Sequence, residues 1–565
     1  MPSKKKSKLT QPSSPTEPSE TSVPWWKDAV VYQIYPRSFQ DSNGDGVGDL
    51  QGIIDRLDYL NGGPESLGID AIWLSPVYPS PMFDFGYDIS DYEGIDPVFG
   101  DLYTFKILLK ECHKRNIKLI MDLVVNHTSH LHPWFIESRS SKDNPKRNWY
   151  IWKDAENGKV PNNWMSAFGG SAWEWDAKTE QYYMHGFTKE QPDLNWRNPE
   201  VKDAIFKMIA YWLDMGVDGF RLDVVNYYFK DSQFRNNPRS FFRGFREYER
   251  QFHFFDRDLE ETHTVLKEFR KLMDSYPGDR MSVGEVFVPP PGDVRIPATY
   301  YGSSDQPELH MAFNFAFMYT KWNAKLFRTR IEEWEKALSE EMWPNYTLSN
   351  HDQKRHITRY SKGKFTLSRA KISAIMLLTL RGTPFLYYGE EIGMLSDKIP
   401  KKSLRDPAGI RYWPLPVGRD SARQPMCWDK SKYGGFSKSE PWLPISRNIF
   451  ENNVKTQESD PTSLLKIYKK LISIRKSEMA LKRGSQRLLF RSNDRILAYL
   501  RIYEDSEILI LLNFSAEETR FYSGGEKLRS ERAKVLFSTH RKEDSYFDLN
   551  IISLLPYEGN ILRLE

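Results

Sequence analysis

The stretch IKLIMDLVVNH (residues 117–127) decides the fold, because it joins a buried strand pattern to polar residues at its end. A nearly continuous apolar run of this length is typical of a strand covered on both faces of a parallel sheet. Asp122, Asn126 and His127 stand in the second half of the run. In parallel α/β folds, polar residues at the carboxyl ends of strands indicate a site that does chemistry.

Runs of the same kind recur along the chain, and longer helical patterns such as residues 101–116 and 199–216 separate them. The seven further runs are AVVYQIYP (29–36), DAIWLSP (70–76), VDGFRLDVV (217–225), RMSVGEVFV (280–288), ELHMAFNFAF (308–317), PNYTLSNHD (344–352) and GTPFLYYGEE (382–391). Alternation of strands and helices in eight units predicts an α/β fold, a TIM (β/α)8 barrel. A doubly wound open sheet is the alternative, and the lack of a G-x-G-x-x-G pattern after the first run weakens it.

The spacing of these runs predicts three folded parts. Residues 126–195 are rich in Trp, Asn, Gly and Ser, and we expect them to form an inserted domain over the carboxyl end of the barrel. The barrel itself is expected to span residues 25–125 and 196–483, the last part being a long helix over 463–482. Residues 484–565 then change to hairpin patterns, with a polar turn at Glu504–Ser506, and predict a separate antiparallel β-sandwich domain.

The composition excludes several classes of protein. The chain has 565 residues with 80 Lys and Arg against 76 Asp and Glu, and a net charge of +4 indicates neither nucleic acid nor a membrane as a partner. No run of 18 apolar residues could span a bilayer. Cys112 and Cys427 are too few for a disulfide framework and fit a reducing compartment, so we expect a cytoplasmic protein. Residues 1–24 are basic and rich in Ser and Pro, which predicts a disordered tail and not a secretory signal.

Polar residues at the ends of four predicted strands should meet at one mouth of the barrel. These residues are Asp122, Asn126 and His127, then Arg221 and Asp223, then Glu285, and finally His351 and Asp352. An all-oxygen metal cage is the alternative, but histidine and arginine suit it poorly. Two carboxylates around a scissile bond are what glycoside hydrolysis requires, one ionised and one protonated. Arg221 would keep Asp223 ionised, and crowding by like charges would raise the pKa of Glu285.

Four of these segments resemble the signature regions of the α-amylase superfamily, glycoside hydrolase family 13. They are DLVVNH (122–127), GFRLDVV (219–225), GEVF (284–287) and SNHD (349–352). Four others resemble the α-glucosidase and oligo-1,6-glucosidase branch of that family, namely VVYQIYPRSFQDSNGDGVGDLQGI (30–53), FGYDISDY (85–92), QPDLNW (191–196) and GRDSARQPMCWD (418–429). The resemblance runs from about Trp25 to the end of the chain.

The resemblance implies an exo-acting, retaining α-glucosidase. Asp223 would be the nucleophile, Glu285 the acid and base, and Asp352 the residue that holds sugar hydroxyls. The other implied substrate-binding residues are His127, Arg221 and His351 around the reacting sugar, Asp84, Tyr87 and Arg423 at the closed end of the pocket, and the aromatic residues Phe168 and Phe187. An Asp–Arg pair at that end could bind the terminal glucose and block longer chains.

The linkage and the fate of the glucosyl group stay open. Val224 after the nucleophile resembles enzymes that act on α-1,6 bonds, whereas GEVF differs from the GEM that is usual in oligo-1,6-glucosidases. Short α-1,4- and α-1,6-linked oligosaccharides and sucrose are therefore all candidate substrates. An α-glucosyltransferase or sucrose isomerase is one alternative, and a non-catalytic binding protein of the same fold is another. Retention of all three carboxylates argues against the binding protein.

The loop DSNGDGVGDL (41–50) begins like an EF-hand calcium loop, D-x-[DN]-x-[DN]-G. It follows a strand, and its twelfth position is Gly52, so the bidentate Glu of an EF-hand is missing. A metal-free turn rich in Asx residues is the alternative. The resemblance implies a structural Ca²⁺ or Mg²⁺ here, with ligands Asp41, Asn43, Asp45, the carbonyl of Val47, and Asp49.

Overall fold

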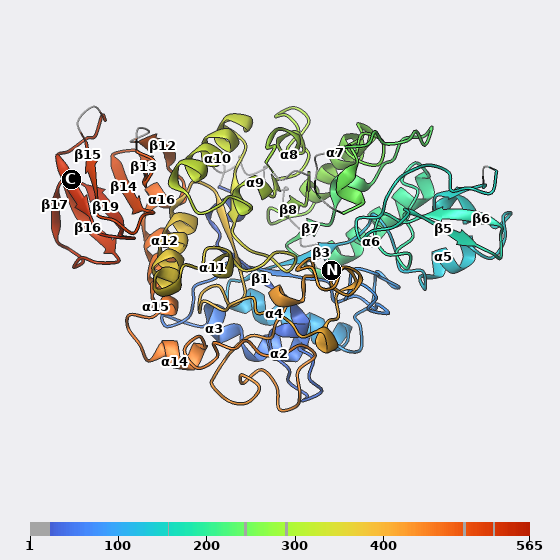
Figure 1. Cartoon of the computed structure of the whole chain (residues 1–565), viewed down its shortest axis with the longest axis horizontal. Helices are drawn as coiled ribbons and strands as arrows, with labels where there is room; N and C mark the ends of the chain where they lie inside the picture. Colours follow the sequence, from blue (N-terminus) through green and yellow to red (C-terminus); the bar gives the residue numbers. More distant parts are fainter. Residues whose placement is uncertain are drawn as a thin grey trace, which may run out of the picture.

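The computed structural model describes residues 23–155, 157–241, 244, 246–288, 292–489, 493–523 and 526–565 (Figure 1). The predicted tail over residues 1–24 lies outside these ranges except for its last two residues. Among the described residues, no helix has the length and apolar character needed to cross a bilayer.

Eight short parallel strands form the central sheet, and each lies within one of the eight predicted runs. The order is β10-β11-β1-β2-β3-β7-β8-β9, so consecutive strands along the chain are neighbours in the sheet. Their bounds are β1 Val31–Ile34, β2 Ala71–Leu74, β3 Lys118–Leu123, β7 Gly219–Leu222, β8 Met281–Gly284, β9 Met311–Ala312, β10 Asn345–Thr347 and β11 Thr383–Tyr387. This arrangement confirms the predicted TIM barrel.

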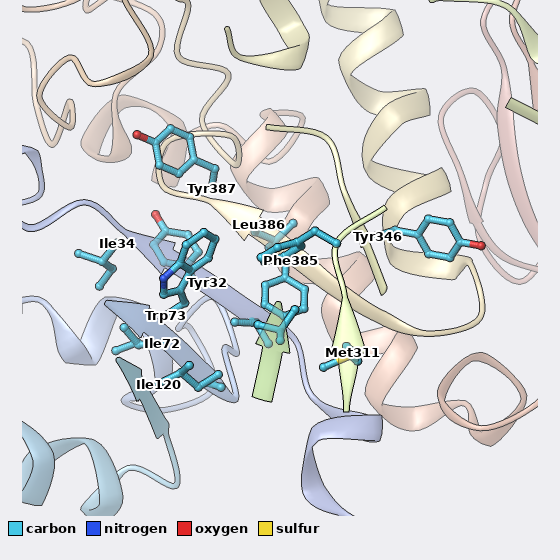
Figure 2. Packing of buried hydrophobic residues seen from close by; sticks show 14 of the residues in the cluster. Tyr32, Ile34, Ile72, Trp73, Ile120, Met311, Tyr346, Phe385, Leu386 and Tyr387 are labelled. Carbon is cyan, nitrogen blue, oxygen red and sulfur yellow. The ribbon is translucent and has the colours of Figure 1, made fainter. Parts of the chain in front are cut away.

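Side chains join the two ends of the sheet and fill its interior. The amide of Asn345 on β10 donates to the carbonyl of Ala312 on β9 at 2.7 Å, and both residues are fully buried. Figure 2 shows Trp73 of β2, Met311 of β9 and Phe385 of β11 in one packed cluster. The barrel is therefore a solid core, and ligands can reach only its ends.

Helices follow the strands and cover the sheet, and their ends match the capping residues in the sequence. Asp101 caps α4 by accepting from the backbone of Thr104 at 2.7 Å, and Gly216 ends α6 in the left-handed conformation at φ 104°. The longer helices are α4 Leu102–Lys114, α6 Pro199–Met215, α7 Glu261–Asp274, α10 Ala324–Ala337, α12 Thr366–Thr379 and α15 Leu464–Ser477. The short ones are α1 Trp25–Asp28, α2 Leu50–Asp55, α3 Leu57–Asn61, α8 Arg295–Thr299, α9 Phe315–Met318, α11 His356–Arg359, α13 Pro407–Arg411 and α14 Val454–Glu458.

The segment between β3 and α6 leaves the barrel and returns to it at one point. It contains α5 Pro133–Ser138 and a small antiparallel sheet of β4 Trp152–Lys153, β6 Gln181–Met184 and β5 Trp173–Asp176. At its base, the backbone N–H of Leu194 donates to the carbonyl of Asn126 at 3.0 Å. This pairing places the end of β3 and the returning chain side by side at the barrel mouth, and Figure 1 shows β5 and β6 projecting from the barrel.

The C-terminal part consists of antiparallel strands that pack around their own apolar core. A six-stranded sheet contains β12 Ser485–Leu489, β13 Ile496–Tyr503, β14 Ser506–Asn513, β19 Gly559–Leu564, β16 Arg532–Ser538 and β17 Tyr546–Asp548. A two-stranded sheet of β15 Thr519–Tyr522 and β18 Ile551–Leu554 faces it across that core. Figure 1 shows these strands at the opposite end of the molecule from β5 and β6.

Two local predictions in this part are wrong. The helix expected over 463–482 ends at Ser477, and α16 Met479–Lys482 follows after Glu478 takes an extended conformation at ψ 108°. The hairpin turn contains only Glu504 and Asp505, because Ser506 already pairs with Tyr503. Glu504 has φ 50°, which suits the tight two-residue turn between twisted strands.

Candidate active site

A cavity of about 210 Å³ lies at the carboxyl ends of the barrel strands. Nine predicted site residues line it, namely Asp84, Tyr87, His127, Phe168, Phe187, Asp223, Glu285, His351 and Asp352. Arg221 and Arg423 are fully buried behind this lining. The strand ends thus bring together residues that lie far apart in the sequence.

The guanidinium of Arg221 is the cation around which the cavity floor is built. It donates through Nη1 to Asp122 at 2.6 Å and to Asp223 at 2.8 Å, and through Nη2 to Glu285. These carboxylates come from β3 and from the ends of β7 and β8, which are adjacent in the sheet. Buried carboxylates are strongly unfavourable without a partner. The guanidinium of Arg221 therefore allows all three carboxylates to lie at one place.

The pKa shift of Glu285 has the predicted direction, whereas that of Asp223 has the opposite direction. Burial raises the pKa of Asp223 well above its ordinary value, and Glu285 adds to this effect although Arg221 opposes it. The guanidinium of Arg221 lowers the pKa of Asp223, but it does not offset burial and the neighbouring carboxylates. Burial and the charge of Asp352 also raise the pKa of Glu285 against Arg221. Neighbouring carboxyls with raised pKa values can share one proton, and such a pair offers one ionised carboxylate and one acid.

Asp352 is held in the opposite state. Its Oδ1 accepts from Arg423 at 3.0 Å and from Arg419 at 3.4 Å, and its Oδ2 lies 3.2 Å from Nε2 of His351. Burial opposes ionisation, but His351 and the two guanidinium groups outweigh it and hold the pKa of Asp352 well below its ordinary value. Asp352 is therefore an ionised hydrogen-bond acceptor on the cavity wall.

The tautomer of His351 follows from its neighbours. The amide nitrogen of Gln33 donates to Nδ1 at 2.8 Å, so the proton of the neutral ring is on Nε2. Nε2 lies 2.7 Å from the hydroxyl of Tyr87, whose ring stacks on His351 at 5.3 Å, and that hydroxyl donates to Asp122 at 3.0 Å. Burial lowers the pKa of His351 well below its ordinary value and keeps it neutral. The imidazole is thus a fixed N–H donor beside Asp352.

The closed end of the cavity corrects one prediction. Arg423 was expected to pair with Asp84 there, but Arg423 binds the carbonyl of His351 and Asp352 behind the lining. Arg419 takes that place, since its Nη2 donates to Asp84 at 2.5 Å and its guanidinium lies 4.8 Å from the ring of Phe168. Arg419 belongs to the same GRDSAR segment, so the motif located the segment but not the arginine that reaches the cavity.

Several other residues at or near the cavity were not predicted from the sequence. Gln191 donates to Asp84 at 3.2 Å and lies 3.1 Å from Nε2 of His127, and it is the first residue of the QPDLNW motif that could have indicated it. Val224 and Phe287 also line the cavity, and they stand in the predicted runs 217–225 and 280–288. The other lining residues come from segments without a recognisable pattern, and they are Ala167, Tyr227, Arg246, Tyr248, Tyr319, Gln353, Ala408 and Val417.

Backbone strain marks the residue after Asp223. Val224 is buried and adopts a left-handed conformation with φ 34° and ψ 47°, which is unfavourable for a β-branched side chain. The next N–H, that of Val225, donates to the carbonyl of Glu285 at 3.1 Å. The strained turn therefore links the ends of β7 and β8 immediately beside the two central carboxyls.

The predicted metal loop lies away from this cavity and is folded into Asx turns. Asp41 accepts from the backbone of Gly44 at 2.6 Å and of Gly46 at 2.8 Å, and Asp45 accepts from that of Val47 at 2.8 Å. Asn43 accepts from Asp45, and Asp49 caps α2. The oxygen donors suit a hard cation. However, within the described residues no group of three or more Asp, Glu, His or Cys side chains is arranged to hold a metal ion, so the loop is not arranged as a finished cage.

Comparison with known proteins is consistent with this geometry. Residues 33–484 match the family described as alpha amylase, catalytic domain. An oligo-1,6-glucosidase from Parageobacillus thermoglucosidasius is 40% identical over 96% of this chain and 99% of its own. The crystal structure of an α-glucosyl transfer enzyme, XgtA, superposes with a TM-score of 0.88 at 38% identity, covering 96% of this chain and 100% of the other. The crystal structure of trehalulose synthase from Pseudomonas mesoacidophila MX-45 superposes with a TM-score of 0.86 at 35% identity, covering 96% of this chain and 100% of the other.

The role of Arg221 can be tested through the pH dependence of stability. Arg221→Gln removes the counter-charge of three carboxylates and raises their pKa values in the folded state further. A carboxyl whose pKa is raised in the folded state destabilises the protein once the pH rises above the pKa that the same group has in the unfolded state. We expect the free energy of unfolding of Arg221→Gln, measured with urea, to be slightly lower than that of the wild type at pH 5. The difference should grow to roughly 3–5 kcal/mol at pH 8.

Arg197→Gln is the matched control, because Arg197 pairs with Glu261 at 2.7 Å on the surface. Its effect should stay below about 1 kcal/mol and hardly change with pH. An equal loss at pH 5 and pH 8 for Arg221→Gln would contradict the assigned role.

Proposed function

The chain belongs to the α-amylase family of glycoside hydrolases, and we propose that it is an exo-acting, retaining α-glucosidase. It releases glucose from the non-reducing end of short α-1,4- or α-1,6-linked oligosaccharides, with sucrose as a further substrate. The observation that carries this proposal is the ion pair of Arg419 and Asp84, which closes one end of the cavity that holds Asp223 and Glu285.

The closed end supports action on a terminal sugar. Arg419 is held from the other side by Asp406, which accepts from its Nε at 2.6 Å, so the guanidinium cannot swing away easily. A fixed guanidinium–carboxylate pair offers donors and acceptors that match sugar hydroxyls. A chain that continued beyond this sugar would have to pass through the ion pair, so only an end residue fits.

The placement of the two carboxyls supports retention of configuration. Asp223 and Glu285 accept from the two terminal nitrogens of one guanidinium and are therefore close neighbours. Retaining enzymes hold their carboxyls about 5–5.5 Å apart, whereas inverting enzymes need about 6.5–9.5 Å to admit a water molecule. Contact with one small cation favours the shorter separation.

The proposed reaction has two steps. The Asp223 carboxylate attacks C1 of the terminal glucose while Glu285 transfers its proton to the glycosidic oxygen, which leaves with the rest of the substrate. Glu285 next takes a proton from water, whose oxygen attacks C1 and releases Asp223. Ionised Asp352 accepts hydrogen bonds from sugar hydroxyls, and the ring of His351 lies beside it on the cavity wall.

The linkage and the acceptor are the open parts of the proposal. Val224 beside the nucleophile and similarity to an oligo-1,6-glucosidase support α-1,6 bonds. Similarity to XgtA and to trehalulose synthase supports the second candidate, in which a sugar and not water takes the glucosyl group. We also propose a cytoplasmic enzyme, in keeping with the buried, free thiols of Cys112 and Cys427.

Chemical rescue with azide tests the roles of the two carboxyls. Asp223→Ala and Glu285→Ala should each lower turnover of disaccharides about a thousandfold or more. With α-glucosyl fluoride, azide should replace the missing carboxylate of Asp223→Ala and give β-glucosyl azide. In Glu285→Ala it should attack the glucosyl-enzyme and give α-glucosyl azide. The same anomer from both variants would refute the assignment.

A substrate panel tests exo action and distinguishes the two candidate functions. Isomaltose, maltose, panose, sucrose and trehalose are each incubated with the enzyme, and the products are separated by chromatography. We expect glucose from isomaltose, maltose and panose, and none from a cyclodextrin, which has no free end. New disaccharides from concentrated sucrose without free glucose would favour the isomerase or transferase.

We further propose that the loop of Asp41, Asn43, Asp45, Val47 and Asp49 binds Ca²⁺ or Mg²⁺ as a structural ion. Support comes from the carboxylates of Asp41 and Asp49, which are buried and, among the described residues, form no ion pair with Lys or Arg. A cation would compensate this charge and would steady the turn that precedes α2.

Chelation tests this ion. If Ca²⁺ is present at about 100 times its Kd, its removal should lower the stability by about 3 kcal/mol, seen as a lower melting temperature. Turnover at low temperature should change little, because the loop does not line the cavity. Asp45→Ala should lose this sensitivity to EDTA, whereas Asp505→Ala on an exposed turn should keep it. An unchanged melting temperature of the wild-type protein after EDTA treatment would contradict the proposal that the loop binds an ion.

A further inference from the structure

Two tyrosines form part of the cavity wall. Tyr227 and Tyr248 both line the cavity, and their hydroxyl groups share a hydrogen bond. Arg257 connects this wall to the acid, since it donates to the carbonyl of Phe287 at 2.9 Å and lies 5.8 Å from the ring of Tyr227. Phe287 is two residues beyond Glu285 and also lines the cavity.

The position of this wall indicates which part of a substrate would meet it. Arg419 and Asp84 bind the terminal glucose at the closed end. The glycosidic oxygen must lie at Glu285 to receive its proton. The group beyond that oxygen then lies beside Phe287 and the two tyrosines, which present flat aromatic faces suited to a sugar ring.

A buried histidine holds this wall from behind. His253 is 6% exposed, and its Nδ1 lies 2.8 Å from a carboxylate oxygen of Asp256 and its Nε2 lies 2.9 Å from the carbonyl of Tyr248. Both partners can only accept, so both ring nitrogens must carry hydrogen and His253 is an imidazolium. In turn, His253 outweighs the effect of burial and lowers the pKa of Asp256.

The imidazolium also contacts the ring that it supports. The rings of His253 and Tyr248 stack with centroids 3.9 Å apart and planes inclined by 26°. A cation on the face of a phenol ring is attracted to it, so His253 holds both the backbone and the ring of Tyr248. Neither His253 nor Asp256 lines the cavity, and the bond chemistry at Asp223 and Glu285 makes no use of them.

We propose that His253 is a positioning residue for the leaving and accepting sugar. The charge of His253, which Asp256 stabilises, holds Tyr248 in position. Tyr248 in turn holds Tyr227 against the sugar beyond the scissile bond. His253 thereby sets how strongly that sugar is bound, while the terminal glucose is bound independently by the closed end. This inference rests on the proposed α-glucosidase function.

Substrates with and without a leaving sugar separate this role from a merely structural one. His253→Gln keeps one donor but loses the charge and one of the two contacts. We expect kcat/KM for maltose and isomaltose to fall about tenfold, mainly through KM, and that for α-glucosyl fluoride to fall less than about twofold. Fluoride makes no contact with the tyrosines, so only the sugar-containing substrates should respond.

A second variant keeps the test independent of the folding of His253→Gln. Tyr227→Phe preserves the ring but removes the hydroxyl that bonds Tyr248. We expect kcat/KM for maltose and isomaltose to fall about threefold, with little change for α-glucosyl fluoride. His263→Gln is the matched control, since His263 pairs with Glu308 at 2.7 Å and packs on Tyr300 away from the cavity. His263→Gln should not lower kcat/KM for the disaccharides more than it lowers kcat/KM for α-glucosyl fluoride.

Two outcomes would be decisive against separate claims. Equal losses on disaccharides and on α-glucosyl fluoride, in variants whose melting temperatures match the wild type, would overturn the positioning role of His253. Failure of the wild-type enzyme to cleave any of these substrates would instead overturn the proposed function.

Discussion

The contact of Arg221 with three carboxylates is the constraint on which the site depends. Asp122, Asp223 and Glu285 come from three neighbouring strands, and only parallel strands in this order bring them to one guanidinium. Without that cation, burial would force protons onto all three groups. With it, the charge is compensated only in part, so the pKa values of Asp223 and Glu285 stay above their ordinary values. The proposed function uses this incomplete compensation, because it needs one ionised and one protonated carboxyl.

The barrel and its strand ends were predictable because they rest on local patterns. Each buried strand is a short apolar run, and the residue that ends it points to the same mouth in every unit. This is why Asp223, Glu285 and Asp352 could be located without coordinates, although their chemical roles remain predictions. The protonation of Asp223 was not predictable, because it depends on burial and on charges contributed by other strands.

The errors lie where long irregular segments decide the geometry. Arg419 and Arg423 stand four residues apart in one motif, and only the path of the loop determines which one reaches Asp84. Tyr227, Tyr248 and Gln191 likewise come from segments without periodic patterns. The helix break at Glu478 was not predictable either, since the helical pattern of the sequence continues through this residue.

Different loops build the two ends of the cavity, and this separation has a functional consequence. The closed end comes from the loop after β2 and the loop after β11, which carry Asp84 and Arg419. The opposite wall comes from the segment after β7, which carries Tyr227, Tyr248 and His253. Under the proposed function, changes in the second segment would alter the sugar or water that meets the glucosyl group without disturbing recognition of glucose. This separation fits relatives that are named as an oligo-1,6-glucosidase, an α-glucosyl transfer enzyme and a trehalulose synthase and that are 35–40% identical to this chain.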